Sequence, residues 1–448
     1  MVSPVVLHAV SSREPVEALG GLRASLSLLR RNRDFRRLYL ASVISLGGDW
    51  FLLVALFALA LELTGSAVSV ALLVVSQEIP FFVMSPVGGM LADGVDRRRL
   101  MVACDIARAV LCLGFLFVRD ASTLWIAYPL LASISSCSAV FDPASSAAFP
   151  NLVHADDLGP ANALFGSVWG TMLALGAALG GVVAAALGPE AAFVIDAASF
   201  ATSALLIARI RRAFSEERTA AAGNAGLLEA TVETVRFARR DHRVLALLSV
   251  KAGFGLAAGV IVLLSVVADS VFGAGAIGIG ILMAARGVGA LIGPFLGRWI
   301  AGPDDRRLFA AIGAALAVFG LGYAVFGLMP TLLLAAPAVA VAHLGGGAQW
   351  TLSSYGLQRV VPDRLRGRIF AADGALITLT ITISSLLTAW SASTFGARAT
   401  AIGLGLVAIV YAAVWAWLTT DVRRATMLDG CGPAPTFGPP EAAEVELA

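Results

Sequence analysis

The chain alternates between long apolar stretches and short polar connections over most of its length. A helix needs about 20 predominantly apolar residues to cross the hydrocarbon core of a bilayer, and stretches of that size follow one another. Irregular backbone is costly within lipid, so each stretch is expected to be helical. We predict twelve transmembrane helices, at residues 38–63, 67–91, 100–118, 124–149, 161–187, 191–210, 244–268, 276–299, 308–327, 332–357, 369–390 and 400–418.

A long polar segment divides these predicted spans into six and six. Its GLLEATVETVRFARR stretch places Leu228, Val232 and Val235 on one helical face, which predicts an interfacial amphipathic helix between two halves. The tail is rich in Pro, Gly, Ala and Glu and is expected to be disordered. The expected parts are a cytoplasmic N-terminal segment (1–37), an N-terminal bundle (38–210), a cytoplasmic linker (211–243), a C-terminal bundle (244–418) and the tail (419–448).

The two halves are also related in sequence. An ungapped shift of 208 residues aligns Pro86 with Pro294, Gly89 with Gly297, Gly94 with Gly302, Asp96 with Asp304, Gly159 with Gly367, and Arg98–Leu100 with Arg306–Leu308. Such a match is typical of parallel six-helix repeats with a pathway between them. The repeat has diverged at Asp93, which falls opposite Ala301.

Composition and charge agree with a membrane protein. Hydrophobic residues make up 58% of the 448 residues and charged residues 14%, whereas charged residues are about a quarter of a soluble domain; mean hydropathy is +0.85. The net charge of +2 gives no indication of nucleic-acid binding. The four cysteines are scattered without CxxC spacing, so neither a disulfide framework nor a metal site is expected.

Arginine recurs on every second connection, which predicts the orientation of the spans. The connections expected outside contain only Arg119 and Arg398 as basic residues, and the acidic connection 151–158 is the one exception inside. The N-terminal segment lacks the apolar core and cleavage site of a signal peptide. We expect both termini in the cytoplasm. The arginine-bearing connections are at 97–99, 209–243, 298–307, 359–368 and 423–424.

The connection after the second span reads GGMLADGVDRRRL, at residues 88–100. It resembles the loop between helices 2 and 3 of the major facilitator superfamily, roughly G-x-L-A-D-R-x-G-R-[RK]. Gly94 and Asp96 stand where that family often has Arg and Gly. An ordinary positive-inside hairpin would explain the arginines but not the G-x-L-A-D before them. The matching residues are Gly89, Leu91, Ala92, Asp93, Arg97 and Arg98.

Other stretches resemble the drug/proton antiporter branch of that superfamily, which includes enterobactin- and macrolide-exporter-like proteins. They are NRDFRRLYLASVISLGGDWFLLVAL, FDPASSAAFPNLV, FVIDAASF, AARGVGALIGP and VVPDRLRGRIF. The fifth span departs from the antiporter pattern, because Ala177 replaces a Pro and Met172 a Gly. The resemblance implies that Asp93 caps the helix beginning near residues 367–369 in an outward-open state. Arg97 would hold acidic groups, with Asp142 as one possible partner.

Ionisable residues inside predicted spans are costly and therefore functional candidates. Asp49 and Glu78 lie near the middle of the first two spans. Desolvation favours the protonated form of a carboxylate, as a proton-coupling site requires. The alternative for each is a structural hydrogen bond to a neighbouring helix.

Cationic residues in the second half are candidates for binding substrate or for neutralising these carboxylates. Arg286 is in the middle of the eighth span, with Asp49 or Glu78 as possible partners. Lys251 lies in the seventh span, where snorkelling to the interface is an alternative role. His343 is the one histidine within a span.

Further intramembrane charges are expected to be structural. Asp105 and Arg108 are three residues apart in the third span, so they can pair on one helical face as a structural or gating pair. Asp142 and Asp196 lie nearer the ends of their spans.

Other classes of protein lack their signatures in this sequence. The four histidines form no HExxH or similar motif, and no GxxxxGK[ST] loop is present. We therefore expect a transporter, not an enzyme, without cofactor or metal, acting as a monomer in the bacterial plasma membrane.

The expected fold is an all-α membrane protein of two pseudo-symmetric six-helix bundles. Its predicted function is proton-coupled export of a small amphipathic molecule, such as a drug, antibiotic or siderophore. Uptake of a metabolite and a non-transporting or lipid-handling role remain as alternatives. The mid-span carboxylates favour transport over the last of these.

Overall fold

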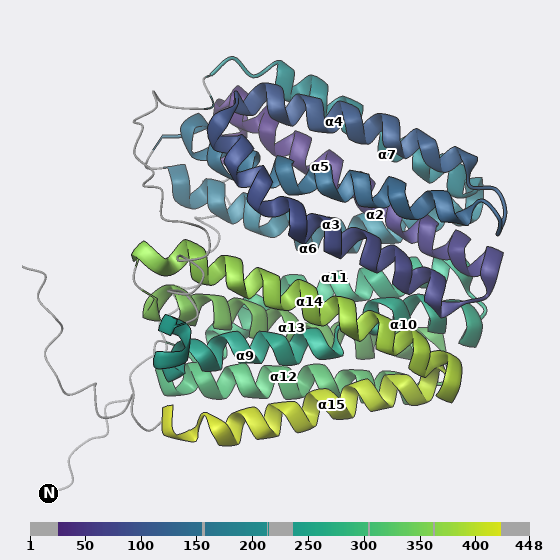
Figure 1. Ribbon diagram of the computed structural model, residues 1–448, viewed down its shortest axis with the longest axis vertical. Coiled ribbons are helices and arrows are strands. Elements are labelled where there is room, and N and C mark those ends of the chain that lie inside the picture. Colours follow the sequence, from purple (N-terminus) through teal and green to yellow (C-terminus); the bar gives the residue numbers. More distant parts are fainter. Residues whose placement is uncertain are drawn as a thin grey trace, which may run out of the picture.

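The computed structural model describes residues 26–154, 157–212, 214, 236–302, 305–361 and 363–422. In this part of the chain every regular element is helical, and the helices form two stacked bundles (Figure 1). Helices α2–α7 make the N-terminal half and α9–α15 the C-terminal half. Of the predicted linker helix only residues 236–240 are described, and they are helical; Leu228, Val232 and Val235 and the tail beyond residue 422 lie outside the described residues.

All twelve predicted spans are confirmed by helices long and apolar enough to cross a membrane. Those of the N-terminal half are α2 (Arg33–Thr64), α3 (Ala67–Gly94), α4 (Arg97–Gly114), α5 (Ala127–Ala148), α6 (Leu158–Leu187) and α7 (Pro189–Ala208). Those of the C-terminal half are α9 (His242–Ala257) with α10 (Val260–Val266) and the π-helical turn η5 (Val267–Val271), α11 (Gly275–Ala301), α12 (Asp305–Leu328), α13 (Leu332–Val360), α14 (Asp363–Phe395) and α15 (Ala397–Leu418).

Helices begin where a polar side chain can accept a hydrogen bond from their first turn. Asn32 accepts from the Phe35 N–H at 2.9 Å, and Asp96 accepts from the Arg99 N–H at 2.8 Å. The helix α2 ends at Gly65, whose φ of 61° is left-handed and suits only glycine without strain. These local signals place the tight connections between spans.

The seventh span is interrupted between α9 and α10, which the apolar pattern did not predict. The Ser384 hydroxyl of α14 enters the gap, donating to the Leu256 carbonyl at 2.5 Å and accepting from the Gly259 N–H at 2.9 Å. A side chain that satisfies backbone groups in this way breaks the regular ladder of helical hydrogen bonds. The break leaves α10 free to turn toward the opposite half, where it packs against α2 and α3.

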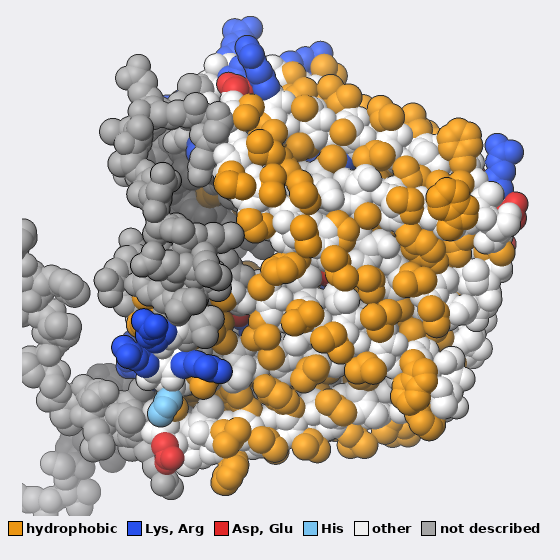
Figure 2. Space-filling view, in the orientation of Figure 1, with side chains coloured by type: hydrophobic (Ala, Val, Ile, Leu, Met, Phe, Trp, Pro, Cys, Tyr) orange, Lys and Arg blue, Asp and Glu red, His pale blue; other side chains and the backbone are white. Residues whose placement is uncertain are grey.

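The two ends of the molecule differ in charge. We call one end the basic end, because Arg97–Arg99, Arg209, Arg211, Arg212 and Arg298 lie there, and the other the short-loop end, defined by Gly65, Gly188 and Gly396. Figure 2 shows hydrophobic side chains over the lateral face, with most of the visible Lys and Arg side chains at its left-hand, basic end. A broad apolar belt of this kind is what contact with lipid requires.

Two clusters of buried apolar residues form the core. The larger includes residues of both halves, such as Phe57 of α2 and Leu263 of α10. The smaller lies within the N-terminal half at the basic end and includes Phe35, Met101 and Ile207. The two halves thus share apolar packing, while the N-terminal half also has a core of its own.

Candidate functional site

A buried ion pair lies inside the N-terminal half. Asp105 and Arg108 of α4 form it as predicted, with side chains 0% and 3% exposed. The guanidinium lies between the rings of Phe141 and Phe200, at 4.5 and 4.3 Å from their centroids. It also donates to the Ser138 hydroxyl at 3.2 Å. Arg108 is thereby fixed by contacts with α5 and α7.

Three further carboxylates surround this pair. The charge of Arg108 acts on Asp49, Asp142 and Asp196, and Asp49 in turn interacts electrostatically with Asp105, Asp142 and Asp196. These side chains come from α2, α4, α5 and α7. We call the five residues the acidic cluster. Asp49 therefore faces the charges of its own half.

The members of the acidic cluster differ in access to solvent. Asp196 is 0% exposed and accepts hydrogen bonds from the Cys112 thiol and the Ser199 hydroxyl, both at 3.1 Å. Asp49 is partly exposed and Asp142 is exposed. Two carboxylates of the cluster are thus enclosed in the protein interior, and two are at least partly exposed at the molecular surface.

A second charged group lies between the halves. The Arg286 guanidinium of α11 is 6.0 Å from the Trp50 ring of α2 and 5.8 Å from the Trp169 ring of α6. Its charge also interacts with Glu78 of α3, although these two form no ion pair among the described residues. The Arg286 Nε is buried and has no hydrogen-bond partner in the described part of the chain. Of the two predicted partners of Arg286, Glu78 is the one with which its charge interacts, without an ion pair among the described residues, and Asp49 interacts with Arg108 instead.

His343 of α13 lies near Arg286, inside the C-terminal half. Its Nε2 shares a 2.7 Å hydrogen bond with the Tyr323 hydroxyl, and its ring packs edge-on against Phe319. His343 is only 4% exposed. Both Tyr323 and His343 interact electrostatically with the charge of Arg286. The histidine is therefore fixed by Tyr323 in the protein interior and has little access to solvent.

A third charged group is internal to the C-terminal half. Lys251 of α9 forms an ion pair with Asp373 of α14 and donates to the Ser354 hydroxyl of α13 at 2.9 Å. Its ammonium also lies 4.9 Å from the Trp350 ring centroid. Because Lys251 is 1% exposed, the snorkelling alternative is wrong: the buried Asp373 provides a closer partner than the interface.

Sequence reasoning missed Asp373, Trp50 and Trp169. Asp373 is a carboxylate near the start of a predicted span, and an intramembrane lysine in the same half called for such a partner. The aromatic partners of Arg286 carried no comparable signal, because tryptophans are also enriched at both membrane–water interfaces without any charged partner.

The loop between α3 and α4 forms hydrogen bonds with its own half. Arg97 donates to the Ala92 and Phe214 carbonyls at 3.1 and 3.2 Å, and Arg98 donates to the Arg212 carbonyl at 2.8 Å. Gly89 has no neighbour within 4 Å of where a Cβ would lie. Asp93 is in the last turn of α3, but its side chain is not among those described. The helix α14 begins at Asp363, earlier than predicted, because its polar first turns extend the transmembrane helix.

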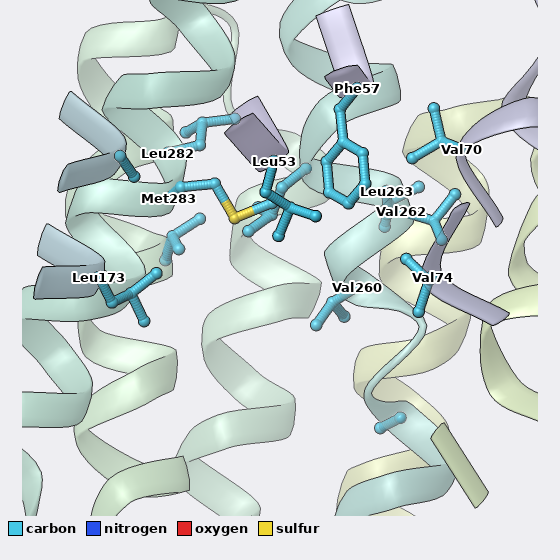
Figure 3. Close-up of a cluster of buried hydrophobic side chains, with 14 of the residues drawn as sticks. Leu53, Phe57, Val70, Val74, Leu173, Val260, Val262, Leu263, Leu282 and Met283 are labelled. Carbon is cyan, nitrogen blue, oxygen red and sulfur yellow. The ribbon is translucent and has the colours of Figure 1, made fainter. Parts of the chain in front are cut away.

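The halves close on each other toward the short-loop end. Figure 3 shows an apolar cluster in which Phe57 of α2 and Val74 of α3 lie beside Leu263 of α10. The helices α6 and α11 also approach closely: a Cβ on Gly181 would lie 3.0 Å from the Gly280 Cα. Both observations place tight packing between the charged residues and this end of the molecule.

Comparison with known proteins agrees with this architecture. The family described as transmembrane secretion effector matches residues 24–445. The MFS-type transporter YfiS of Bacillus subtilis, named as uncharacterized, is 30% identical over 216 residues, 48% of this chain and 51% of that protein, so the match spans about half of its length. The multidrug efflux pump Tap of Mycolicibacterium fortuitum is 24% identical over 392 residues, 84% of this chain and 94% of that protein.

A solved structure has the same fold. It is the crystal structure of a bacterial homologue of the human lysosomal transporter Spinster, in an inward-facing and unoccupied conformation, with a TM-score of 0.68 and 14% sequence identity. The similarity covers 90% of this chain and 99% of that one. With the family match, the twelve spans and the two stacked bundles, the chain belongs to the major facilitator superfamily of membrane transporters, in the family described as transmembrane secretion effectors.

Proposed function

We propose that this transporter exports a small amphipathic molecule from the bacterial cytoplasm in exchange for protons, by alternating access between its halves. The observation that carries the proposal is the grouping of four carboxylates around the single charge of Arg108. The basic end faces the cytoplasm, as the positive-inside rule requires, so both termini lie inside. Similarity to a protein named as a multidrug efflux pump supports export over uptake.

The acidic cluster provides the proton site. If every carboxylate were ionised, four negative charges and one positive charge would leave a formal charge of −3 inside the membrane. Buried net charge is costly in low dielectric, so the cluster retains protons instead. Asp49 is the coupling residue, because it interacts with every other member and is partly exposed. Asp142, which is exposed, connects it to water.

The group around Arg286 provides the substrate site. The exposed Trp169 ring offers a flat apolar surface beside Trp50, and the partly exposed Arg286 guanidinium offers hydrogen-bond donors. Glu78 is the counter-ion of Arg286 across the halves. An ionised Glu78 can also accept a hydrogen bond from a donor group of the substrate, and protonation removes that charge. Proton binding and substrate binding therefore compete at this site, as exchange requires.

In this proposal we assign the described conformation to the inward-open state. Apolar packing by Phe57, Val74 and Leu263 seals the short-loop end. We infer that the partly exposed charges of Asp49, Glu78 and Arg286 line a path between the halves, because a charge that faced lipid would be too costly. In the outward-open state Asp93 caps the beginning of α14, and Arg97 and Arg98 hold the loop beside it.

Transport in proteoliposomes with an imposed pH gradient tests the proposal. The protein is assayed with a panel of hydrophobic dyes and compared with Asp49→Asn and Glu78→Gln. The matched control is Asp120→Asn, which alters a carboxylate in the short-loop connection that is bonded to Ser122 and Thr123. We expect gradient-driven dye movement that either intramembrane substitution abolishes and the control retains.

The outcomes separate coupling from folding. Melting temperature in detergent verifies that each variant is folded. If the wild type moves dyes and both intramembrane variants move them equally well, the carboxylates are structural and the proposed coupling is wrong. If dyes move without regard to the pH gradient, transport stands and proton exchange does not.

A further inference from the structure

A charged pocket at the basic end takes no part in the proposed transport cycle. It has a volume of about 620 Å³. Three segments far apart in the sequence form it: the beginning of α2, the turn before α6 and the chain that follows α7. Its lining consists of Arg31, Asn32, Arg33, Asp34, Arg37, His154, Asp157, Arg211 and Arg212.

The framework of the pocket is held by hydrogen bonds. Asp34 accepts from the backbone N–H groups of Arg211 and Arg212, at 3.3 and 3.0 Å. The Asn32 amide and the Arg212 guanidinium both donate to the Leu152 carbonyl, at 2.7 and 3.0 Å. The three segments are therefore fixed before any ligand binds, which favours binding by preorganisation.

The lining has an excess of positive charge. Five arginines and two aspartates give a formal charge of +3 with His154 neutral. Arg31 pairs with Asp157, and Arg37 pairs with Asp34 at 2.9 Å. Both carboxylates are thus already engaged. Arg33 and Arg211 are exposed and form no ion pair within the described chain. Two guanidinium groups remain available for an anion, and their planar donor pattern matches phosphate.

The position of the pocket favours a lipid headgroup over a soluble anion. The membrane-length helix α2 begins at Arg33, so the pocket lies at the basic end of the first span. Arg33, Arg37 and Leu40 share one face of α2, and Leu40 is 40% exposed one turn deeper than Arg37. On α7, Leu205 is 50% exposed one turn deeper than Arg209. Charge at the interface with apolar surface beneath it is complementary to a phospholipid.

A second basic pocket extends the first. Its volume is about 610 Å³, and it shares Arg37 and Arg211 with the first pocket while adding Arg98 and Arg209. The two together form a continuous arginine-lined surface from α2 to the beginning of α4. We propose that this surface binds the phosphate headgroup of an anionic phospholipid, with Arg33 and Arg211 as its principal ligands.

Lipid titration of the purified full-length protein tests the proposal. Melting temperature is measured in neutral detergent while short-chain phosphatidylglycerol, or phosphatidylcholine of the same chain length, is added. We expect a shift with phosphatidylglycerol that exceeds the shift with phosphatidylcholine. In the double variant Arg33→Gln, Arg211→Gln, the titration midpoint should rise roughly 30-fold, from the loss of two cation–headgroup interactions.

Matched arms identify the source of any effect. The control double variant Arg119→Gln, Arg398→Gln removes the same charge at the short-loop end and should titrate like the wild type. Equal midpoints for Arg33→Gln, Arg211→Gln and the wild type would overturn the proposal. Inorganic phosphate is titrated in parallel. If inorganic phosphate, without lipid, produces the same arginine-dependent shift in melting temperature, the ligand is a soluble anion and the lipid assignment is wrong.

Discussion

Lys251 of α9 and Asp373 of α14 form an ion pair from which solvent is almost excluded, with side chains 1% and 6% exposed. One carboxylate oxygen of Asp373 has no further hydrogen-bond partner among the described residues. A buried ion pair of this kind adds little stability to the folded protein compared with apolar residues of similar size. Removing one partner is nevertheless strongly destabilising, because the other charge is left buried and unpaired. The pair thus fixes α9 and α14 in one relative position more than it adds net stability.

We predict strong non-additivity at this pair. Lys251→Met should destabilise the protein by about 3–5 kcal/mol, because Asp373 is left buried and unpaired. The double variant Lys251→Met, Asp373→Leu should recover most of that loss. Melting temperatures of the two single variants and the double variant measure the coupling. Additive losses would show that the charges do not interact in the membrane-embedded protein.

The twelve spans were predictable because the physics that defines them is local. Lipid offers no hydrogen bonds to the backbone, so any apolar stretch of sufficient length becomes a helix whatever surrounds it. The break at Gly259 was not predictable, since it depends on Ser384, which comes from α14, 125 residues away. Hydropathy contains no information about such a distant hydroxyl.

The candidate site was predictable in residue type but only partly in pairing. An ionisable side chain is costly inside a membrane whatever its orientation. That cost alone identifies Asp49, Glu78, Arg286 and Lys251 as candidates. Which charge faces which is decided by helix rotation. Asp49 thus meets Arg108 of its own half, whereas Glu78 is left to interact with Arg286 across the halves. The rotation follows from packing between helices, which a single sequence does not encode in any short pattern.

Tyr323 and His343 provide a second prediction. Their 2.7 Å hydrogen bond is buried beside Arg286, so Tyr323→Phe leaves a histidine nitrogen without its partner. We expect a loss of about 1–3 kcal/mol in stability. Melting temperature provides the measurement, and Tyr128→Phe, at a half-buried tyrosine on α5, is the matched control. Equal melting temperatures for the wild type and Tyr323→Phe would mean that water or another group replaces the hydroxyl.

Asp241 allows a prediction about pH. Partial burial raises the pKa of this carboxylate, but hydrogen bonds and the charge of Arg243 outweigh burial and hold the pKa below its ordinary value. A folded-state pKa below the unfolded value of about 3.9 stabilises the protein above that pH, and the contribution is lost as pH falls through the folded-state pKa. Asp241 also caps α9 by accepting from the Arg243 N–H at 2.9 Å.

We therefore expect Asp241→Ala to lower the melting temperature at pH 5–8, through a loss of about 1 kcal/mol for the cap. The difference from wild type should shrink as the pH falls below about 4. Asp241→Asn keeps an accepting oxygen without the charge and should recover most of the loss at neutral pH. A difference that stays constant down to pH 3 would assign the effect to packing instead of ionisation.

The contact of α6 with α11 at Gly181 allows a prediction about conformation. A Cβ at Gly181 would lie 2.7 Å from the Ala276 carbonyl oxygen and 3.0 Å from the Gly280 Cα. Both neighbours are backbone atoms, so the helices must separate to admit even a methyl group. If the halves alternate, Gly181→Ala should disfavour the state closed at the short-loop end. It should open the seal formed by Phe57, Val74 and Leu263, whose apolar cluster also contains Leu53 of α2 (Figure 3).

Labelling kinetics can measure that shift. Leu53→Cys, in a background with the native cysteines replaced, reports access from the short-loop end to an impermeant maleimide. We expect Gly181→Ala to accelerate labelling several-fold, whereas Gly403→Ala, at a helical glycine with no neighbour within 4 Å, should leave it unchanged. If Gly181→Ala lowers only the melting temperature, the α6–α11 contact is static packing and the opening must occur elsewhere. If it accelerates labelling, the same glycines that let the helices approach also set the balance between the two states, because a contact made in only one state can bias the equilibrium.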